Sequence, residues 1–211
     1  MAVMNETGRQ TPSAMTIAGS DSGAGAGVQA DLKTFAALGV YGTSVLTAIT
    51  AQNTVAVTAV HEIPTDIIEA QIDAVVSDIG ADATKTGMLS SRVIIECVTE
   101  SLKKYADVPG LRRLVVDPVM VAKSGDSLLR EDAVGALRDR LLPPAAVVTP
   151  NIPEAETLTG LTIITDEDVR EAARAIVAMG TASVVALSLI NIRRCRRTTA
   201  SCAQLQPPHY Q

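Results

Sequence analysis

Short apolar runs alternate along this chain with segments in which apolar residues recur every three or four positions. The apolar runs predict strands at 14–19, 42–49, 55–62, 83–86, 114–117, 145–149 and 182–189. The periodic segments predict helices at 25–38, 66–79, 91–105, 130–141, 152–159 and 166–179. This alternation is typical of a doubly wound α/β fold, with a mostly parallel central sheet flanked by helices. Ligands of such folds bind beyond the carboxyl ends of the strands.

The loop after the first predicted strand is the most informative stretch. Residues 16–35 contain four glycines and then begin an amphipathic helix. Glycines let the backbone come close to a ligand, and the helix start offers free N–H groups. The face predicted to be apolar also carries a carboxylate, and its residues are Val28, Asp31, Leu32 and Phe35. A carboxylate there needs a partner or a ligand, unless the loop lies on the surface with Asp31 at the edge of the stripe.

Two later strands are followed by acids. Asp117 ends the apolar run at 114–117, and Asn151 and Glu154 follow the run at 145–149. Both carboxylates are therefore expected near one crevice, where Mg²⁺ takes oxygen ligands together with substrate phosphate. The alternative is that Asp117 and Glu154 only cap helices.

Composition excludes several classes of function. The 211 residues suit one domain, only 2% are aromatic, and the net charge of −5 disfavours general nucleic-acid binding. Three cysteines without CxxC spacing and two histidines support neither a zinc site nor a histidine-based triad. The glycine loop matches neither the P-loop nor the dinucleotide fingerprint. No apolar run suggests a membrane span and no signal peptide is visible, so we expect a cytoplasmic protein.

Five runs, in this order, resemble the hydroxymethylpyrimidine/phosphomethylpyrimidine kinases of thiamine biosynthesis, which have a ribokinase-like fold. The runs are 16–35, 44–54, 85–89, 117–126 and 149–155. The resemblance covers about 14–185. It implies that the γ-phosphoryl group of ATP is transferred to 4-amino-5-hydroxymethyl-2-methylpyrimidine and then to its monophosphate.

The resemblance also implies roles for single residues in the substrate pocket. Asp31 and Gln52 would make the polar contacts to the pyrimidine, and the pocket walls would be Gly19, Met88 and Val119. A flat ring with a polar edge needs such a carboxylate and amide, with apolar groups above and below it. Gln52 and Met88 favour an aminopyrimidine over a pyridoxal-type vitamin, which is the alternative substrate.

The same resemblance places the Mg²⁺ and phosphate region at Asp117, Asn151 and Glu154, with Asp117 and Glu154 as metal ligands. Lys123 is a weaker candidate, because a solvated lysine also explains it. Members of the family are commonly homodimers, so we expect a homodimer that binds a small-molecule aminopyrimidine.

After about Val185 the chain departs from the family pattern, which has a Gly-Thr-Gly-Cys or Gly-Thr-Gly-Asp run here. No glycine follows Gly180, no acid follows Glu171, and four of the last nineteen residues are arginines. A shifted reading frame or a rearranged C-terminus explains the change, and a basic arm is the alternative. We therefore expect a disordered segment at 1–13, a truncated ribokinase-like domain at 14–185 and an aberrant basic tail at 186–211. No catalytic residue is identified, so an impaired kinase and a non-catalytic pyrimidine-binding protein both remain open.

Overall fold

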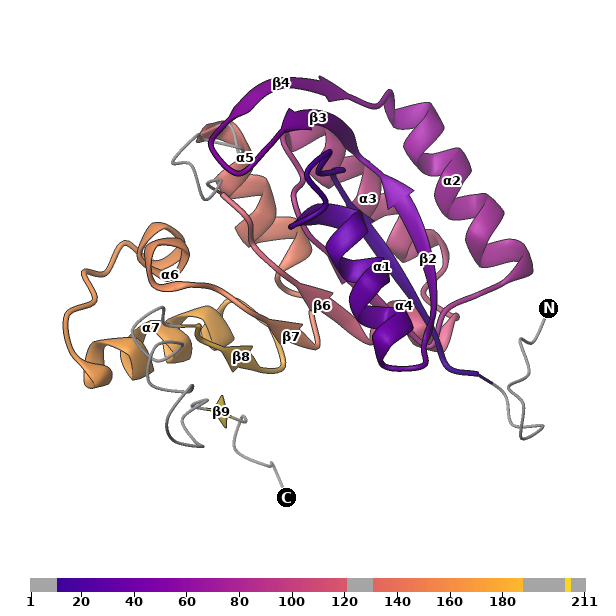
Figure 1. The fold of residues 1–211 in the computed structure, drawn as a ribbon. Coiled ribbons are helices and arrows are strands. Elements are labelled where there is room, and N and C mark those ends of the chain that lie inside the picture. The colour runs from indigo at the N-terminus through magenta and orange to yellow at the C-terminus, as the bar shows by residue number, and fades with distance from the viewer. Residues whose placement is uncertain (1–10, 121–130, 188–203, 206–211) are drawn as a thin grey trace.

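One large sheet forms the centre of the protein (Figure 1). The computed structural model describes residues 11–120, 131–187 and 204–205. The strand order is β2-β1-β5-β6-β7-β8-β9; neighbours from β2 to β8 are parallel, and β9 runs antiparallel to β8. The strands are β1 (Ser13–Ala18), β2 (Tyr41–Leu46), β5 (Ala83–Thr86), β6 (Leu114–Val116), β7 (Val147–Val148), β8 (Val184–Val185) and β9 (Gln204–Leu205).

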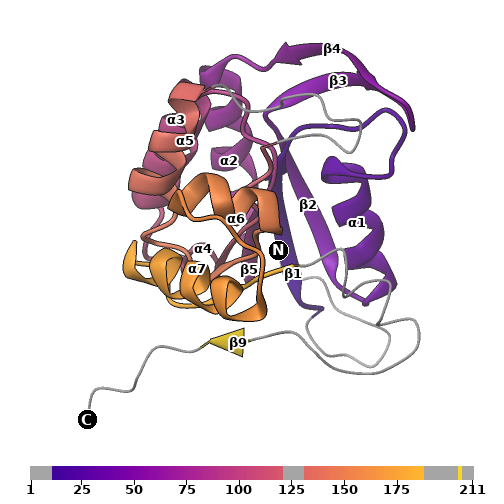
Figure 2. The same ribbon diagram turned by 90° about the vertical axis from the view of Figure 1, so that its left-hand side faces the viewer.

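Helices cover both faces of this sheet, which confirms the doubly wound α/β fold. The helix α1 lies on one side of β1 and β2, and α2, α3 and α5 lie on the other side (Figure 2). The helices are α1 (Gly27–Ala37), α2 (Thr65–Asp78), α3 (Arg92–Lys104), α4 (Pro109–Arg112), α5 (Glu131–Ala136), the π-helical turn η1 (Leu137–Leu141), α6 (Ile152–Thr159) and α7 (Asp166–Ala178). The short helix α4 was not predicted. Within the described residues, no helix is both long and apolar enough to cross a bilayer.

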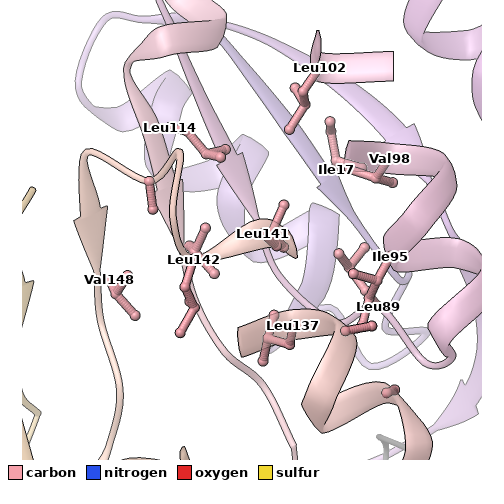
Figure 3. Packing of buried hydrophobic residues seen from close by; sticks show 14 of the residues in the cluster. Ile17, Leu89, Ile95, Val98, Leu102, Leu114, Leu137, Leu141, Leu142 and Val148 are labelled. Carbon is pink, nitrogen blue, oxygen red and sulfur yellow. The ribbon is translucent and has the colours of Figure 1, made fainter. Parts of the chain in front are cut away.

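The main core lies between the sheet and the layer of α2, α3 and η1. Aliphatic side chains fill it, and one buried cluster contains Ile17 of β1, Ile95 and Val98 of α3 and Leu141 of η1 (Figure 3). All four are fully buried. Each contributes about 1.5–3 kcal/mol relative to an exposed side chain. Because Met15 and Ile17 anchor β1 in this core, the glycine loop at its carboxyl end begins from a well-packed strand.

The predicted strand at 42–49 is wrong at its end, because two strands meet there. β2 ends at Leu46, and the N–H of Thr47 donates to the carbonyl of Ala18 at 3.0 Å. The chain then leaves the main sheet and forms an antiparallel hairpin of β3 (Ala48–Gln52) and β4 (Val57–Glu62). The hairpin stands beyond the carboxyl end of the main sheet (Figure 1).

Several expectations lie wholly or mostly outside the described residues. These are the polar segment at 1–13, of which β1 includes only the last residue, the basic tail at 186–211, and the loop that carries Lys123. They stay predictions.

Candidate functional site

A cavity of about 490 Å³ lies at the carboxyl end of the main sheet. Its walls come from the glycine loop after β1, the start of α1, the end of β3, and the turns after β5 and β6. All five residues predicted to bind substrate line it, namely Gly19, Asp31, Gln52, Met88 and Val119. Asp117 lines it as well. The volume falls in the usual range for small-molecule sites.

Asp21 organises the glycine loop. Its buried carboxylate accepts hydrogen bonds from the backbone N–H groups of Gly23, Gly25 and Ala26 at 2.8–2.9 Å. These three donors of the glycine loop are therefore used within the loop and are not free for a ligand. Gly27 has a φ of +59°, and a Cβ there would lie 2.4 Å from the carbonyl oxygen of Gly19. Only glycine fits this turn.

Asp31 has the partners that a carboxylate on a half-buried helix face requires. Its Oδ2 accepts a hydrogen bond from the hydroxyl of Thr16 at 2.6 Å. The ammonium of Lys85 lies 3.1 Å from Oδ1 and 3.0 Å from Oδ2. The same ammonium lies 3.5 Å from Oδ2 of Asp117. One lysine thus joins two carboxylates on the cavity wall.

Gln52 reaches the cavity from the last position of β3. The hydroxyl of Ser22 donates to its carbonyl at 2.6 Å and accepts from its N–H at 2.8 Å. The side-chain Oε1 accepts from the hydroxyl of Thr50 at 3.3 Å. Among the described residues, no partner takes up the amide nitrogen, which can therefore face a ligand.

The apolar wall depends on a close approach of Gly19 and Met88. A Cβ on Gly19 would lie 2.4 Å from Cε of Met88, so the missing side chain makes room for the thioether. The carbonyl of Met88 accepts a hydrogen bond from Thr47 at 2.9 Å. Val119 is fixed by a turn in which its N–H donates to the carbonyl of Asp117 at 2.8 Å.

Asn151 and Glu154 form the start of α6 and do not line the cavity. The side chain of Asn151 accepts from the N–H of Glu154, and the carboxyl of Glu154 accepts from the N–H of Asn151, both at 2.9 Å. This is a capping box, so Glu154 caps α6. Asp117 instead pairs with Lys85.

Burial raises the pKa of both acids, Asp117 and Glu154. Burial raises the pKa of Glu154 to about 7, against hydrogen bonds from Asn151 and with help from the charge of Asp117. Burial also raises the pKa of Asp117; the ammonium of Lys85 opposes this shift and the charge of Asp31 adds to it. The charge of Asp117 adds to the raised pKa of Glu154, so the two acids are close enough to interact electrostatically.

This neighbourhood fits a divalent cation. Mg²⁺ prefers one or two carboxylates and completes its shell with water and phosphate oxygens. The partly buried carboxyl groups of Asp117 and Glu154, with the amide oxygen of Asn151 beside Glu154, offer that donor chemistry. Among the described residues, no group of three histidine, cysteine or acidic side chains is arranged to hold a metal alone.

Comparison with known proteins decides the family. The sequence model of the family described as phosphomethylpyrimidine kinase matches residues 21–191. The chain belongs to this family. A hydroxymethylpyrimidine/phosphomethylpyrimidine kinase of Rhizobium meliloti (strain 1021) is 54% identical over 176 residues, which are 83% of this chain and 64% of that protein. The chain thus spans less than two thirds of the length of this relative.

Solved structures of similar proteins have the same fold as this chain. A phosphomethylpyrimidine kinase from Clostridium difficile 630 is 50% identical, with a TM-score of 0.77 over 83% of this chain and 74% of that one. A Bacillus subtilis pyridoxal kinase, solved as an ADP complex, is 43% identical, with a TM-score of 0.76 over 85% of this chain and 67% of that one. These neighbours confirm the ribokinase-like arrangement of sheet and helices.

Three residues of the site were not predicted. Lys85 could have been found from the sequence, because it is the one charged residue of the predicted strand at 83–86 and a glycine follows two positions later. Asp21 and Ser22 carried none, because short polar residues between glycines are common in any loop. Their roles appear only when the loop is folded against β3.

Proposed function

We propose that this chain carries the substrate site of a kinase that phosphorylates 4-amino-5-hydroxymethyl-2-methylpyrimidine and its monophosphate with ATP, in thiamine biosynthesis. The observation that carries the proposal is the pairing of the Asp31 carboxylate and the Gln52 amide on one small cavity with Met88 and Val119. A carboxylate accepts from the exocyclic amino group, an amide both donates and accepts, and the thioether and valine cover the faces of the ring.

In the first phosphorylation the hydroxymethyl oxygen attacks the γ-phosphorus as the bond to the leaving ADP breaks, and the hydroxyl gives up its proton. In the second, a phosphate oxygen of the monophosphate attacks in the same way, and ADP again leaves. Positioning and electrostatic stabilisation supply most of the catalysis in such transfers. In the proposed site, Asp31 and Gln52 orient the ring and the apolar wall excludes water. The described residues offer no group that we assign as the base for the hydroxyl proton.

Asp117, Glu154 and Asn151 are proposed to hold Mg²⁺ beside the phosphates of ATP. A bound Mg²⁺ neutralises phosphate charge during transfer. The buried carboxylates are suited to this role, because a cation nearby stabilises their charged forms.

A homodimer is proposed as the assembly, supported by the hairpin, which leaves Ile49 of β3 half exposed on one face and Val60 of β4 half exposed on the other. Exposed large apolar side chains on a sheet that stands away from the main core are suited to contact with another chain. Because the proposed reaction consumes ATP, the cytoplasm is the proposed location.

Two measurements test the substrate. Isothermal calorimetry of the 211-residue chain with 4-amino-5-hydroxymethyl-2-methylpyrimidine should show binding, and pyridoxal should bind more weakly. Turnover is then assayed in a chimera in which the residues after Met179 are replaced by the corresponding segment of the Rhizobium meliloti relative. ATP-dependent phosphorylation of the pyrimidine by the chimera is the expected result. Preferential phosphorylation of pyridoxal would favour the vitamin kinase, and binding without turnover in the chimera would favour a non-catalytic binding protein.

A further inference from the structure

We propose that Lys85 is a positioning residue for pyrimidine recognition, which acts by fixing the carboxylate of Asp31 through its ammonium group. The inference rests on the proposed function and adds a residue to it. Lys85 lies on β5, between Thr84 and Thr86, whose side chains are buried. Side chains alternate along a strand, so Lys85 alone of these three points to the cavity, and it is among the residues that line it.

The hydrogen bonds leave Asp31 with limited acceptor capacity. An ionised carboxylate accepts about four hydrogen bonds. Thr16 occupies one position on Oδ2, and the ammonium of Lys85 lies within 3.1 Å of both oxygens. The remaining capacity is therefore mainly on Oδ1. The contacts with Lys85 and Thr16 fix the rotation of the Asp31 carboxylate. The unused acceptor site on Oδ1 therefore keeps a fixed direction, and an amino group of a ligand can donate to it.

The local backbone makes room for this ammonium. A Cβ on Gly87 would lie 3.1 Å from Nζ of Lys85 and 3.0 Å from Cβ of Ala18. Any larger residue at position 87 would crowd both the ammonium of Lys85 and the side chain of Ala18 in β1. The position of Lys85 is thus built by the turn after β5 as well as by its two acidic partners.

Lys85 also controls the repulsion between two acids. Its ammonium lies between Asp31 and Asp117, at 3.0 Å and 3.5 Å. Without the ammonium, the two carboxylates would face each other across the cavity wall with one less positive charge between them. Asp31 would then lose both its orientation and part of the stabilisation of its charge. Recognition of an amino group at Asp31 should therefore depend on Lys85.

The test is calorimetric titration of 4-amino-5-hydroxymethyl-2-methylpyrimidine into the 211-residue chain and its variants. Lys85→Met should weaken binding about tenfold or more, as expected for hydrogen bonding to a charged group. Lys103→Met is the matched control, because Lys103 is an exposed lysine of α3 that pairs with Glu100. The Lys103→Met variant should bind the pyrimidine with the same affinity as the unaltered chain. Thermal unfolding is recorded for each variant. If Lys85→Met does not fold, Lys85→Gln replaces it, with the same expected loss.

A double-mutant cycle separates positioning from general damage. If Lys85 acts through Asp31, the loss caused by Lys85→Met should shrink to less than about threefold when Asp31→Asn is already present. An undiminished loss in the Asp31→Asn background, or unchanged affinity of the single variant, would overturn the inference alone. Failure of the unaltered chain to bind the pyrimidine would overturn the proposed function first, and the inference with it.

Discussion

The hydroxyl of Ser22 and the backbone of Gln52 exchange two hydrogen bonds, one in each direction, at 2.6 Å and 2.8 Å. Ser22 belongs to the glycine loop, and Gln52 ends the first strand of the hairpin. The pair joins two segments that are thirty residues apart, at the position where both border the cavity. The backbone of Gln52, and with it the direction of its amide, is therefore held by the loop.

Ser22→Ala removes both hydrogen bonds with Gln52, each usually worth about 1 kcal/mol, and should weaken binding of 4-amino-5-hydroxymethyl-2-methylpyrimidine by about 1 kcal/mol. The loss stays modest because Ser22 is exposed, so water can replace the hydroxyl. Calorimetry measures it. Ser13→Ala serves as the control, since the hydroxyl of Ser13 bonds Asp82 at the opposite end of β1. Equal affinity of the Ser22 and Ser13 variants would show that the loop does not position Gln52.

Glu154→Gln should weaken binding of Mg²⁺-ATP while pyrimidine binding stays nearly unchanged. The carboxylate lies at the start of α6, outside the cavity that contains Asp31 and Gln52, and its loss removes one proposed ligand for the cation. The measurement is calorimetry in the chimera described above, with each ligand titrated separately. A variant that loses the pyrimidine and keeps the nucleotide would show that the two halves of the site are reversed.

Local signals explain which parts of the fold could be predicted. The strand at 83–86 and the helix at 152–159 agree with β5 and α6 in both bounds. The capping pair Asn151 and Glu154 is a pattern three residues apart, which needs no tertiary information. The bounds of β8 were less predictable: within the described part of the predicted strand at 182–189, only Val184–Val185 form β8, and β8 pairs with β7 at the single position Val184.

Long-range contacts explain what could not be predicted. The apolar pattern continues through Thr47, so only the hydrogen bond from its N–H to Ala18 shows where β2 ends and the hairpin begins. Asp31 was predicted to need a partner, yet its partner Lys85 is fifty-four residues away. Parallel strands with long crossovers bring such pairs together, and spacing in the sequence does not reveal them.

Gly110→Ala should destabilise the protein strongly, and Gly135→Ala should not. A Cβ on Gly110 of α4 would lie 1.7 Å from the carbonyl oxygen of Ala81, so the backbone must move. We expect a loss of about 1–3 kcal/mol or more in the free energy of unfolding. A Cβ on Gly135 of α5 meets nothing within 4 Å, and alanine there should stabilise the helix by up to about 1 kcal/mol. Urea denaturation compares the two variants; similar stabilities would mean that the approach of α4 to Ala81 is not close.

Glu154 should make stability fall as the pH rises. Its pKa is about 7 in the folded protein and about 4.5 in the unfolded chain, where the side chain is solvated. Between these values the folded state binds more protons than the unfolded state. Linkage then requires the free energy of unfolding to decrease as the pH rises from about 4.5 to about 7 and to level off above that. The raised pKa of Asp117 acts in the same direction.

Glu154→Gln isolates this contribution, because glutamine keeps an acceptor for the N–H of Asn151 and cannot ionise. Denaturation curves of both proteins at pH 5, 6, 7 and 8, with chelator present, give the difference in their free energies of unfolding. Relative to the variant, the free energy of unfolding of the unaltered chain should decrease up to about pH 7. Above that pH, the difference between the two proteins should stay constant. Contributions from the exposed acids are common to both proteins and cancel. A difference that stays constant over the whole range would mean that Glu154 is ionised in the folded protein throughout, so that burial at the start of α6 does not hold its proton.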